Sequence, residues 1–92
     1  MKYLYFSAAW CNPCKTLAPI MAQVGQSVSV QKIDVDSQSA LASQYNVRNV
    51  PTVILVNGST EVKRFVGIQS KETYINAARY IRKFQKKVVY LH

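Results

Sequence analysis

The chain has 92 residues, of which 49% are hydrophobic and 17% charged, a composition that predicts one small globular domain over residues 1–92 and excludes a disordered or multidomain chain. Its 12 Lys and Arg against 4 Asp and Glu give a net charge of +8, which favours partners with acidic surfaces. Because no apolar run approaches the roughly 20 residues that span a bilayer, and the first residues hold no signal-peptide core, we expect a cytoplasmic protein that does not contact a membrane.

The first half of the chain alternates between strand and helix patterns. Residues 2–7 are aromatic and apolar without a breaker, which predicts a central strand buried on both faces. Residues 15–26 carry apolar side chains at helical spacing, and Pro19 is expected to kink this helix, the alternative being two short helices. The alternation over residues 28–35 predicts a second strand. Because a helix separates the two strands, they should pair in parallel.

A short helix and a hairpin follow. Asp36 or Ser37 is expected to cap a helix that runs through Tyr45. Residues 50–56 and 60–66 flank an Asn-Gly pair, which is a strong hairpin signal because both residues tolerate positive φ. With a final helix after the hairpin, the order β-α-β-α-β-β-α predicts an α/β fold with a four-stranded mixed sheet flanked by helices.

The final helix is basic on one side. Ser70 is expected to cap it, and most of its basic residues lie opposite an apolar stripe. The stripe consists of Tyr74, Ile75, Ala78, Ile81 and Phe84. For residues 88–92 the pattern leaves three outcomes open: they extend the helix, pack on the sheet or fray.

Cys11 and Cys14 lie where the first strand gives way to the first helix. At such a junction the first sulfur is beside unpaired backbone N–H groups and the positive end of the helix dipole, which stabilise a thiolate. The second sulfur, one turn along, can attack a mixed disulfide formed by the first. Cys11 is therefore the candidate nucleophile and Cys14 the candidate resolving thiol. Pro13 limits backbone freedom between them, and Trp10 offers an apolar surface to a partner.

Two other uses of the cysteine pair are disfavoured. A tetrahedral zinc site needs about four ligands, and beyond two cysteines the chain has only His92 and four carboxylates, with no second cluster. A purely structural pair is disfavoured because the intervening Asn and Pro are poor residues for a helix interior. We therefore expect no metal and interpret the pair as redox-active.

Several segments, in order, resemble the thioredoxin family. Residues 6–15 (Phe-Ser-Ala-Ala-Trp-Cys-Asn-Pro-Cys-Lys) and 17–20 (Leu-Ala-Pro-Ile) resemble its active-site segment with the kinking proline. Residues 45–52 (Tyr-Asn-Val-Arg-Asn-Val-Pro-Thr) resemble its loop that ends in a cis-proline. The pairs Asn-Gly at 57–58 and Val-Gly at 66–67 fall where that family has its hairpin and the glycine after it. The resemblance covers nearly the whole chain and implies the minimal thioredoxin fold.

The resemblance implies a thiol-disulfide oxidoreductase that reduces protein disulfides with the couple of Cys11 and Cys14. It implies a cis-proline at Pro51, whose missing donor leaves the backbone of Val50 free to pair with an extended substrate segment. The substrate-facing residues that it implies are Trp10, Asn12, Pro13, Val50, Pro51 and Gly67. It also implies a monomer without a bound cofactor, whose disulfide is recycled by a thioredoxin reductase or a small thiol.

The chain departs from the family's pattern at its start and between the cysteines. It begins directly on the strand that leads to Cys11, without the extra strand and helix that usually come first, which leaves a new sheet edge open to self-association. Asn12 stands where the family usually has glycine. Its side chain is expected to hydrogen-bond a sulfur or to cap the helix, with an effect on the reduction potential of either sign.

A third departure concerns proton transfer. Tyr5 stands where the family buries an aspartate that helps to take the proton of the resolving cysteine, whereas the lysine that partners this aspartate is retained as Lys32. A phenol with an unperturbed pKa of about 10 is a poor base near pH 7. Our hypothesis is that Lys32 hydrogen-bonds Tyr5 or relays protons through water; the alternative is a lysine that extends into solvent.

Three alternative functions follow from the same residues. Glutaredoxins share the short N-terminus and use glutathione, but residues 66–70 lack the paired glycine and acid with which they hold it. A non-catalytic accessory subunit can use a thioredoxin surface, although the intact cysteine pair argues against this role. The basic helix with Tyr80 and Tyr90 is compatible with nucleic-acid binding, but a solvated basic face is the commoner meaning of such a pattern.

Overall fold

Within residues 1–90 the elements follow the order that the sequence predicts. The structure is a computed structural model that describes the backbone of residues 1–90 and the side chains of residues 1–84. The elements are β1 (Lys2–Ser7), α1 (Asn12–Val24), β2 (Val30–Asp34), α2 (Ser39–Gln44), β3 (Thr52–Asn57), β4 (Thr60–Val66) and α3 (Lys71–Tyr90). Of the three outcomes left open for residues 88–92, the structure shows the first through Tyr90, whose backbone extends the helix. Leu91 and His92 lie outside the described residues.

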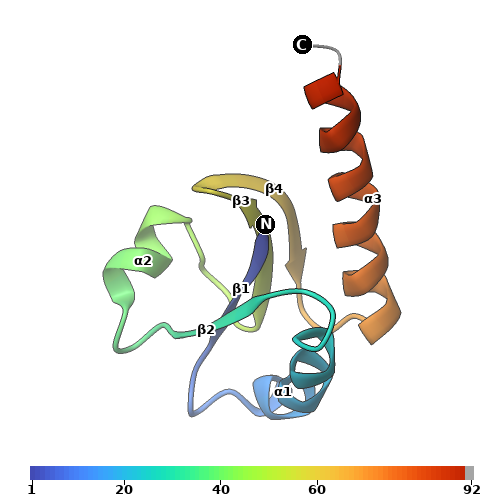
Figure 1. The fold of residues 1–92 in the computed structure, drawn as a ribbon. Helices are drawn as coiled ribbons and strands as arrows, with labels where there is room; N and C mark the ends of the chain where they lie inside the picture. Colours follow the sequence, from blue (N-terminus) through green and yellow to red (C-terminus); the bar gives the residue numbers. More distant parts are fainter. Residues whose placement is uncertain (91–92) are drawn as a thin grey trace.

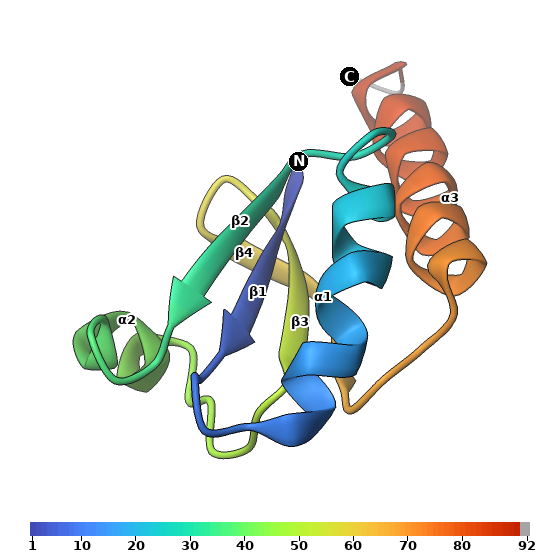
Figure 2. The same ribbon diagram turned by 90° about the horizontal axis from the view of Figure 1, so that it is seen from below.

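The strands form one mixed sheet in the order β2-β1-β3-β4. β1 pairs in parallel with β2 and antiparallel with β3, and β3 pairs antiparallel with β4. The turn between β3 and β4 holds Gly58 at φ 65°, which confirms the predicted hairpin. β1 is thus central, as predicted, and Figure 2 shows β2 on the outer side of it as an edge strand. The segment that follows β1 therefore starts from the middle of the sheet.

Helices cover both faces of the sheet because the side chains of β1 alternate between them. Tyr3 and Tyr5 pack into a core with residues of α1 and α3, whereas Leu4 and Phe6 pack into a second core with Ala42 of α2. Figures 1 and 2 show α1 and α3 on one side of the sheet and α2 on the other. Since burying a large apolar side chain stabilises a fold by about 1.5–3 kcal/mol, β1 contributes to stability on both faces.

α1 begins at Asn12, earlier than the predicted start at residue 15, because the side chain of Cys11 caps it. The helix is continuous through Pro19 and ends at Val24 with Gly25 as its C-cap, in agreement with the predicted end near Gly25 or Gln26. The alternative of two short helices is therefore wrong. Directly after the helix, the backbone N–H of Gly25 donates a hydrogen bond to the carbonyl of Met21 at 2.9 Å.

The predicted cap of α2 is wrong. The helix begins after Gln38, whose side chain makes no capping hydrogen bond. Oδ1 of Asp34 instead accepts the backbone N–H groups of Asp36 at 2.8 Å and Ser37 at 3.3 Å. These two residues therefore form a turn that ends β2 at Asp34 rather than at residue 35, and the helix starts later than predicted. β2 also begins later than predicted, at Val30 rather than at residue 28.

α3 is capped by Ser70, as predicted: its Oγ accepts the backbone N–H of Thr73 at 3.2 Å. Of the predicted stripe, Tyr74 and Ala78 are buried, and two isoleucines pack partly against the same core. Phe84, the last residue of the stripe, is 61% exposed, so the stripe packs on the core only over its earlier turns. Figure 1 shows the last turns of α3 running past the sheet.

In the part of the chain that the structure describes, no helix is both long enough and apolar enough to cross a membrane. The same residues bring together no group of three or more His, Cys, Asp and Glu side chains that would suit a metal ion.

Candidate active site

Cys11 is the N-cap of α1. Its backbone is extended, with φ −92° and ψ 109°, and its Sγ accepts a hydrogen bond from the backbone N–H of Cys14 at 3.2 Å. Pro13 lies in the first turn, where no backbone donor is required. Asn12 is exposed and is the first helical residue, so the cap comes from the cysteine and not, as predicted, from the asparagine. The free N–H groups of this turn favour a thiolate on Cys11.

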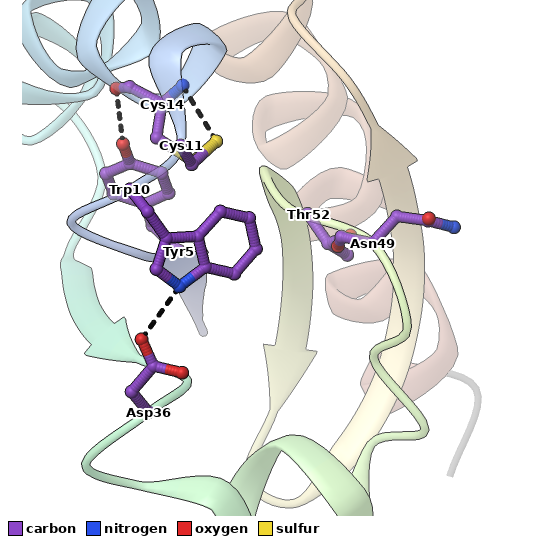
Figure 3. The surroundings of a disulfide bond; sticks show 7 residues. All are labelled: Tyr5, Trp10, Cys11, Cys14, Asp36, Asn49 and Thr52. Atoms are coloured by element: carbon purple, nitrogen blue, oxygen red, sulfur yellow. Dashed lines mark hydrogen bonds between the residues drawn. A yellow bond between two sulfur atoms is a disulfide. The ribbon is translucent and has the colours of Figure 1, made fainter.

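Cys11 and Cys14 are joined by a disulfide, with Cα atoms 5.3 Å apart (Figure 3). Both residues are buried, at 4% and 3% exposure, and they pack with Ala8 against Val35 and Val50. The pair is therefore a redox couple in an apolar setting at the end of the central strand. The disulfide can take up two electrons and two protons to become a dithiol, and it forms again when these are released.

Tyr5 anchors the far side of the cysteine pair. It is buried on β1, and its hydroxyl donates a hydrogen bond to the main-chain carbonyl of Cys14 at 2.9 Å (Figure 3). The hydroxyl points at the backbone of Cys14, so it holds the first turn of α1 on the sheet. Its role here is that of a donor, and it offers no base to the resolving thiol.

The predicted hydrogen bond between Tyr5 and Lys32 is not formed. The two residues are register partners on β1 and β2, but the Tyr5 hydroxyl donates to Cys14 and the Lys32 side chain is exposed. Since neighbouring side chains on paired strands share a face, the two lie close in the sheet. The Lys32 ammonium could only donate to the phenol oxygen, and its side chain is exposed to solvent instead.

Trp10 stands beside the cysteines and is 68% exposed. Its Nε1 donates a hydrogen bond to Oδ2 of Asp36 at 2.9 Å, which Figure 3 shows as the contact between the loop after β1 and the loop after β2. Asp36 was missed by the sequence reasoning, which assigned it a capping role. Because β1 and β2 are parallel, the residues that follow them meet at one edge of the sheet. This rule was the signal by which the contact between Trp10 and Asp36 could have been found.

The loop before β3 completes the site. The peptide bond between Val50 and Pro51 is cis, as the resemblance implies. Val50 packs against the cysteine cluster, and the carbonyl of Pro51 accepts the backbone N–H of Gly67 at 2.9 Å. Gly67 has φ 87°, which favours glycine. The structure therefore brings Val50, Pro51 and Gly67 to the same end of the sheet as the cysteines.

The loop is braced from its own residues. The hydroxyl of Thr52 donates to the carbonyl of Asn49 at 2.6 Å, and Figure 3 shows both residues in the chain opposite the cysteines, with the Asn49 side chain pointing away from the disulfide. The sequence reasoning did not identify this contact. A hydroxyl residue directly after the proline was its only signal in the sequence.

Comparisons with known proteins agree with this geometry. The chain matches the family model named Thioredoxin over residues 2–80. It is 40% identical over 73 residues to the thioredoxin of Chlamydia trachomatis, covering 76% of this chain and 72% of that protein. It is 39% identical over 70 residues to the bifunctional thioredoxin reductase/thioredoxin of Mycobacterium leprae, covering 72% of this chain and 15% of that protein. Thioredoxin 1 from Thermosipho africanus has a similar structure, with a TM-score of 0.80 and 28% identity, covering 94% of this chain and 99% of that one.

These relatives do not favour the glutaredoxin or accessory alternatives, because they are thioredoxins and the present chain keeps both cysteines of the redox pair. Cys11 caps α1 at the end of the central strand, and Cys14 lies one turn along the helix. Together they supply the thiol-disulfide exchange chemistry of thioredoxins. The chain belongs to the thioredoxin family and is a thiol-disulfide oxidoreductase that works through its own redox-active disulfide.

Proposed function

We propose that Cys11 is the nucleophile and Cys14 the resolving thiol in the reduction of disulfides of partner proteins. The observation that carries this assignment is the N-cap position of Cys11, whose sulfur receives the backbone N–H of Cys14 at 3.2 Å. Cys14 lies one turn inside the helix, where its own N–H is already used. The helix terminus therefore stabilises negative charge on the first sulfur more than on the second.

The reaction consists of two exchange steps. The Cys11 thiolate attacks one sulfur of the substrate disulfide, and the other substrate sulfur leaves as a thiolate. The Cys14 thiolate then attacks Sγ of Cys11, which forms the disulfide of the protein and releases the second substrate sulfur. Two electrons pass from the cysteine pair to the substrate, and each released thiolate takes up a proton.

The substrate-facing surface surrounds the cysteines. We assign to it Trp10, Asn12, Pro13, Val50, Pro51 and Gly67. Supporting this assignment, Trp10, Asn12 and Pro13 are exposed next to Cys11, and the residues on either side of Gly67 are the exposed apolar Val66 and Ile68. A net charge of +8 adds attraction for substrates with acidic surfaces.

We place the protein in the cytoplasm as a monomer, with its disulfide reduced again by a thioredoxin reductase or a small thiol. The Mycobacterium leprae relative, whose name joins a thioredoxin reductase with a thioredoxin, supports an enzyme of that kind as the electron donor. Acidic substrates should be recognised through long-range attraction. The value of kcat/KM for such substrates is therefore expected to fall as ionic strength rises, since the Debye length shrinks to about 8 Å at 0.15 M salt.

Insulin reduction by dithiothreitol tests the two roles. Cys11→Ser is expected to abolish catalysis and to form no covalent adduct. Cys14→Ser is expected to stop turnover while accumulating a mixed disulfide at Cys11, detected by mass spectrometry under non-reducing conditions. The assignment would be reversed if an adduct formed on Cys14 in the Cys11→Ser protein and none formed on Cys11 in the Cys14→Ser protein.

The reduction potential tests the direction of the reaction. Equilibration with glutathione, followed by Trp10 fluorescence, is expected to give a value near the roughly −270 mV of thioredoxin. A value at or above about −200 mV would contradict a general reductant and would point to glutathione-coupled or oxidising chemistry.

A further inference from the structure

Resolution of the mixed disulfide requires a proton acceptor that the residues described so far do not supply. Cys14 must lose its thiol proton before it attacks Cys11, and it is only 3% exposed. Tyr5 occupies the strand position beneath it, but its hydroxyl donates to the Cys14 carbonyl. Transfer to bulk water alone is slow for a buried thiol. A carboxylate within reach through water would be a more efficient base.

The structure has such a carboxylate on β2. A cavity of about 230 Å³ opens beside Cys14, and Asp34 lines it from the end of β2. Because one water takes about 30 Å³ in the liquid, the cavity has room for a short water chain between the sulfur and the carboxylate. The register pairs Asp34 with Ser7, the last residue of β1, so the carboxylate lies at the same end of the sheet as the cysteines.

The two oxygens of Asp34 have different tasks. Oδ1 accepts the backbone N–H groups of Asp36 at 2.8 Å and Ser37 at 3.3 Å, which fixes the orientation of the side chain. Oδ2 makes no hydrogen bond among the described residues. Since a carboxylate has about four acceptor sites, this second oxygen can accept a proton without breaking the turn.

The ionisable groups around the cavity favour the products of the transfer. They are Cys14 and Lys15 of α1 and Lys32 and Asp34 of β2, while β1 contributes Ser7 and no charge. Lys32 and Asp34 are two positions apart on one strand, so they share a face. Two cations at this cavity stabilise the Cys14 thiolate that forms when the carboxylate is neutralised. Lys32 therefore acts through its positive charge, which stabilises the Cys14 thiolate, and this role requires no hydrogen bond to Tyr5.

We propose that Asp34 is the proton acceptor for Cys14, through water in the cavity that the two residues share, in place of the carboxylate that Tyr5 replaces on β1. The inference rests on the proposed function. The Cys14 thiol gives its proton to the Asp34 carboxylate, and the resulting thiolate attacks Sγ of Cys11 as the substrate sulfur leaves with the bonding electron pair. The departing substrate thiolate takes up a proton from solvent, and the neutral Asp34 carboxyl returns its proton to water, so that protons balance over the step.

Asp34→Asn is the direct test because asparagine keeps Oδ1 for the two backbone N–H groups but loses the negative charge and, with it, the ability to accept a proton. Reduced protein is mixed with a tryptophan-free peptide disulfide, and closure of the disulfide is followed by Trp10 fluorescence from pH 5 to 10. In the parent, the closure rate is expected to change little between pH 7 and pH 9, because the carboxylate takes the proton. In Asp34→Asn it should be lower at pH 7 by about tenfold or more and should keep rising toward pH 8 to 9, where a free thiol ionises.

Measuring the first exchange step by itself shows whether the Asp34→Asn substitution affects Cys14 or Cys11. In the Cys14→Ser background, the rate of adduct formation at Cys11 is measured with and without Asp34→Asn. The two rates are expected to agree within about twofold. An equal slowing of adduct formation and closure would mean that Asp34 acts on Cys11 or on the fold, and the proposal would then be wrong.

Glu72→Gln is the matched control. Glu72 is an exposed carboxylate on α3, so the variant changes the net charge by the same amount without touching the cavity. Its closure rate and pH profile should match those of the parent. If it reproduced the effect of Asp34→Asn, overall charge rather than proton transfer would be the cause.

Lys32→Met gives a second readout that does not depend on folding of the Asp34 variant. Removing this cation takes away a charge that stabilises the Cys14 thiolate, so the closure rate at pH 7 is expected to fall, while adduct formation at Cys11 in the Cys14→Ser background should change by less than about twofold. An unchanged closure rate would contradict the proposal. If the parent itself did not reduce the peptide disulfide, the proposed function would be wrong. If the parent and Asp34→Asn formed their disulfide at the same rate and with the same pH profile, the proposed function would stand and only the role of Asp34 would be wrong.

Discussion

The hydroxyl of Tyr3 on β1 donates a hydrogen bond of 2.6 Å to the main-chain carbonyl of Tyr74 on α3. Their rings also meet edge to face, with centroids 5.7 Å apart. Both residues are fully buried, and Gln69 donates its backbone N–H to the Tyr74 hydroxyl at 3.1 Å. This pair is therefore the point at which α3 is fixed to the central strand.

Tyr3→Phe should cost about 1 kcal/mol of unfolding free energy at pH 7, because it removes one hydrogen bond and leaves the ring in place. Burial, and then the neighbouring Tyr74, raise the pKa of Tyr3 above the ordinary value of 10.0. The neutral phenol is thus favoured in the folded state, and this contribution is complete below pH 10 and is lost as pH rises above it. Urea unfolding at pH 7 and pH 11 should show a smaller loss in Tyr3→Phe than in the parent. Equal losses would contradict the prediction.

Arg64→Met should destabilise the fold by about 1 kcal/mol. The Arg64 guanidinium forms two hydrogen bonds with Glu61, at 2.8 and 2.7 Å, and also donates to the carbonyl of Tyr45. It therefore ties β4 to the end of α2. Arg64→Lys should recover only part of the loss, because an ammonium group cannot form the same fork. Full recovery in chemical denaturation experiments would show that charge alone matters.

The same pair predicts an acid dependence. The hydrogen bond from Arg64 lowers the pKa of Glu61 below its ordinary value. A lowered pKa in the folded state means that the contribution is present above the unfolded pKa of about 4.5 and is lost as pH falls through the folded value. Glu61→Gln should therefore flatten the acid limb of the stability profile, measured by denaturation between pH 3 and 7. An unchanged limb would assign the loss to other carboxylates.

Gly67→Ala should cost about 1–2 kcal/mol, because φ 87° forces a Cβ into the left-handed region. An added Cβ would meet no atom within 4 Å, so the cost is conformational rather than steric. Gly58→Ala, at φ 65° and equally free of contacts, is the matched control for stability. Only Gly67→Ala should also lower kcat/KM for insulin reduction, since Gly67 lies beside Pro51 at the end of the sheet that carries the cysteines, whereas Gly58 lies in the turn at the other end. Equal activity in both variants would remove Gly67 from the substrate surface.

Asp36→Ala should lower kcat/KM for protein disulfides several-fold while changing the unfolding free energy by less than about 1 kcal/mol. The reason is that an exposed hydrogen bond orients Trp10 without contributing much to stability. Asp36→Asn retains an oxygen acceptor and should behave like the parent. Trp10 fluorescence reports whether the indole has moved. A displaced indole with unchanged kinetics would show that its orientation does not matter to the substrate.

Local patterns were sufficient where one short segment determines its own structure. The apolar run of β1, the Asn-Gly turn and the cap by Ser70 are all confirmed. In each case, the physical cause lies within a few residues: burial on both faces, tolerance of positive φ, and a hydroxyl next to free N–H groups. The cysteine pair at the start of a helix belongs to the same class.

Features that depend on distant segments were not predictable in this way. The cap of α2 failed because the Asp34 side chain took the N–H groups of the following turn. The exposure of Phe84 could not be inferred, because helical periodicity indicates the apolar face of a helix but not where the neighbouring sheet stops. The contact between Trp10 and Asp36 joins two loops that meet only because β1 and β2 are parallel. Such contacts require the topology before they can be inferred.

The central position of β1 affects how the chain is made. Both strands that pair with β1 come later in the sequence, and the antiparallel partner β3 ends at Asn57. During synthesis, the apolar segment Tyr3-Leu4-Tyr5-Phe6 emerges well before it can be covered on both sides. Nascent chains that stop before residue 52 would lack β3 and would leave one edge of β1 unpaired, so quality-control chaperones should bind such chains and release the completed protein.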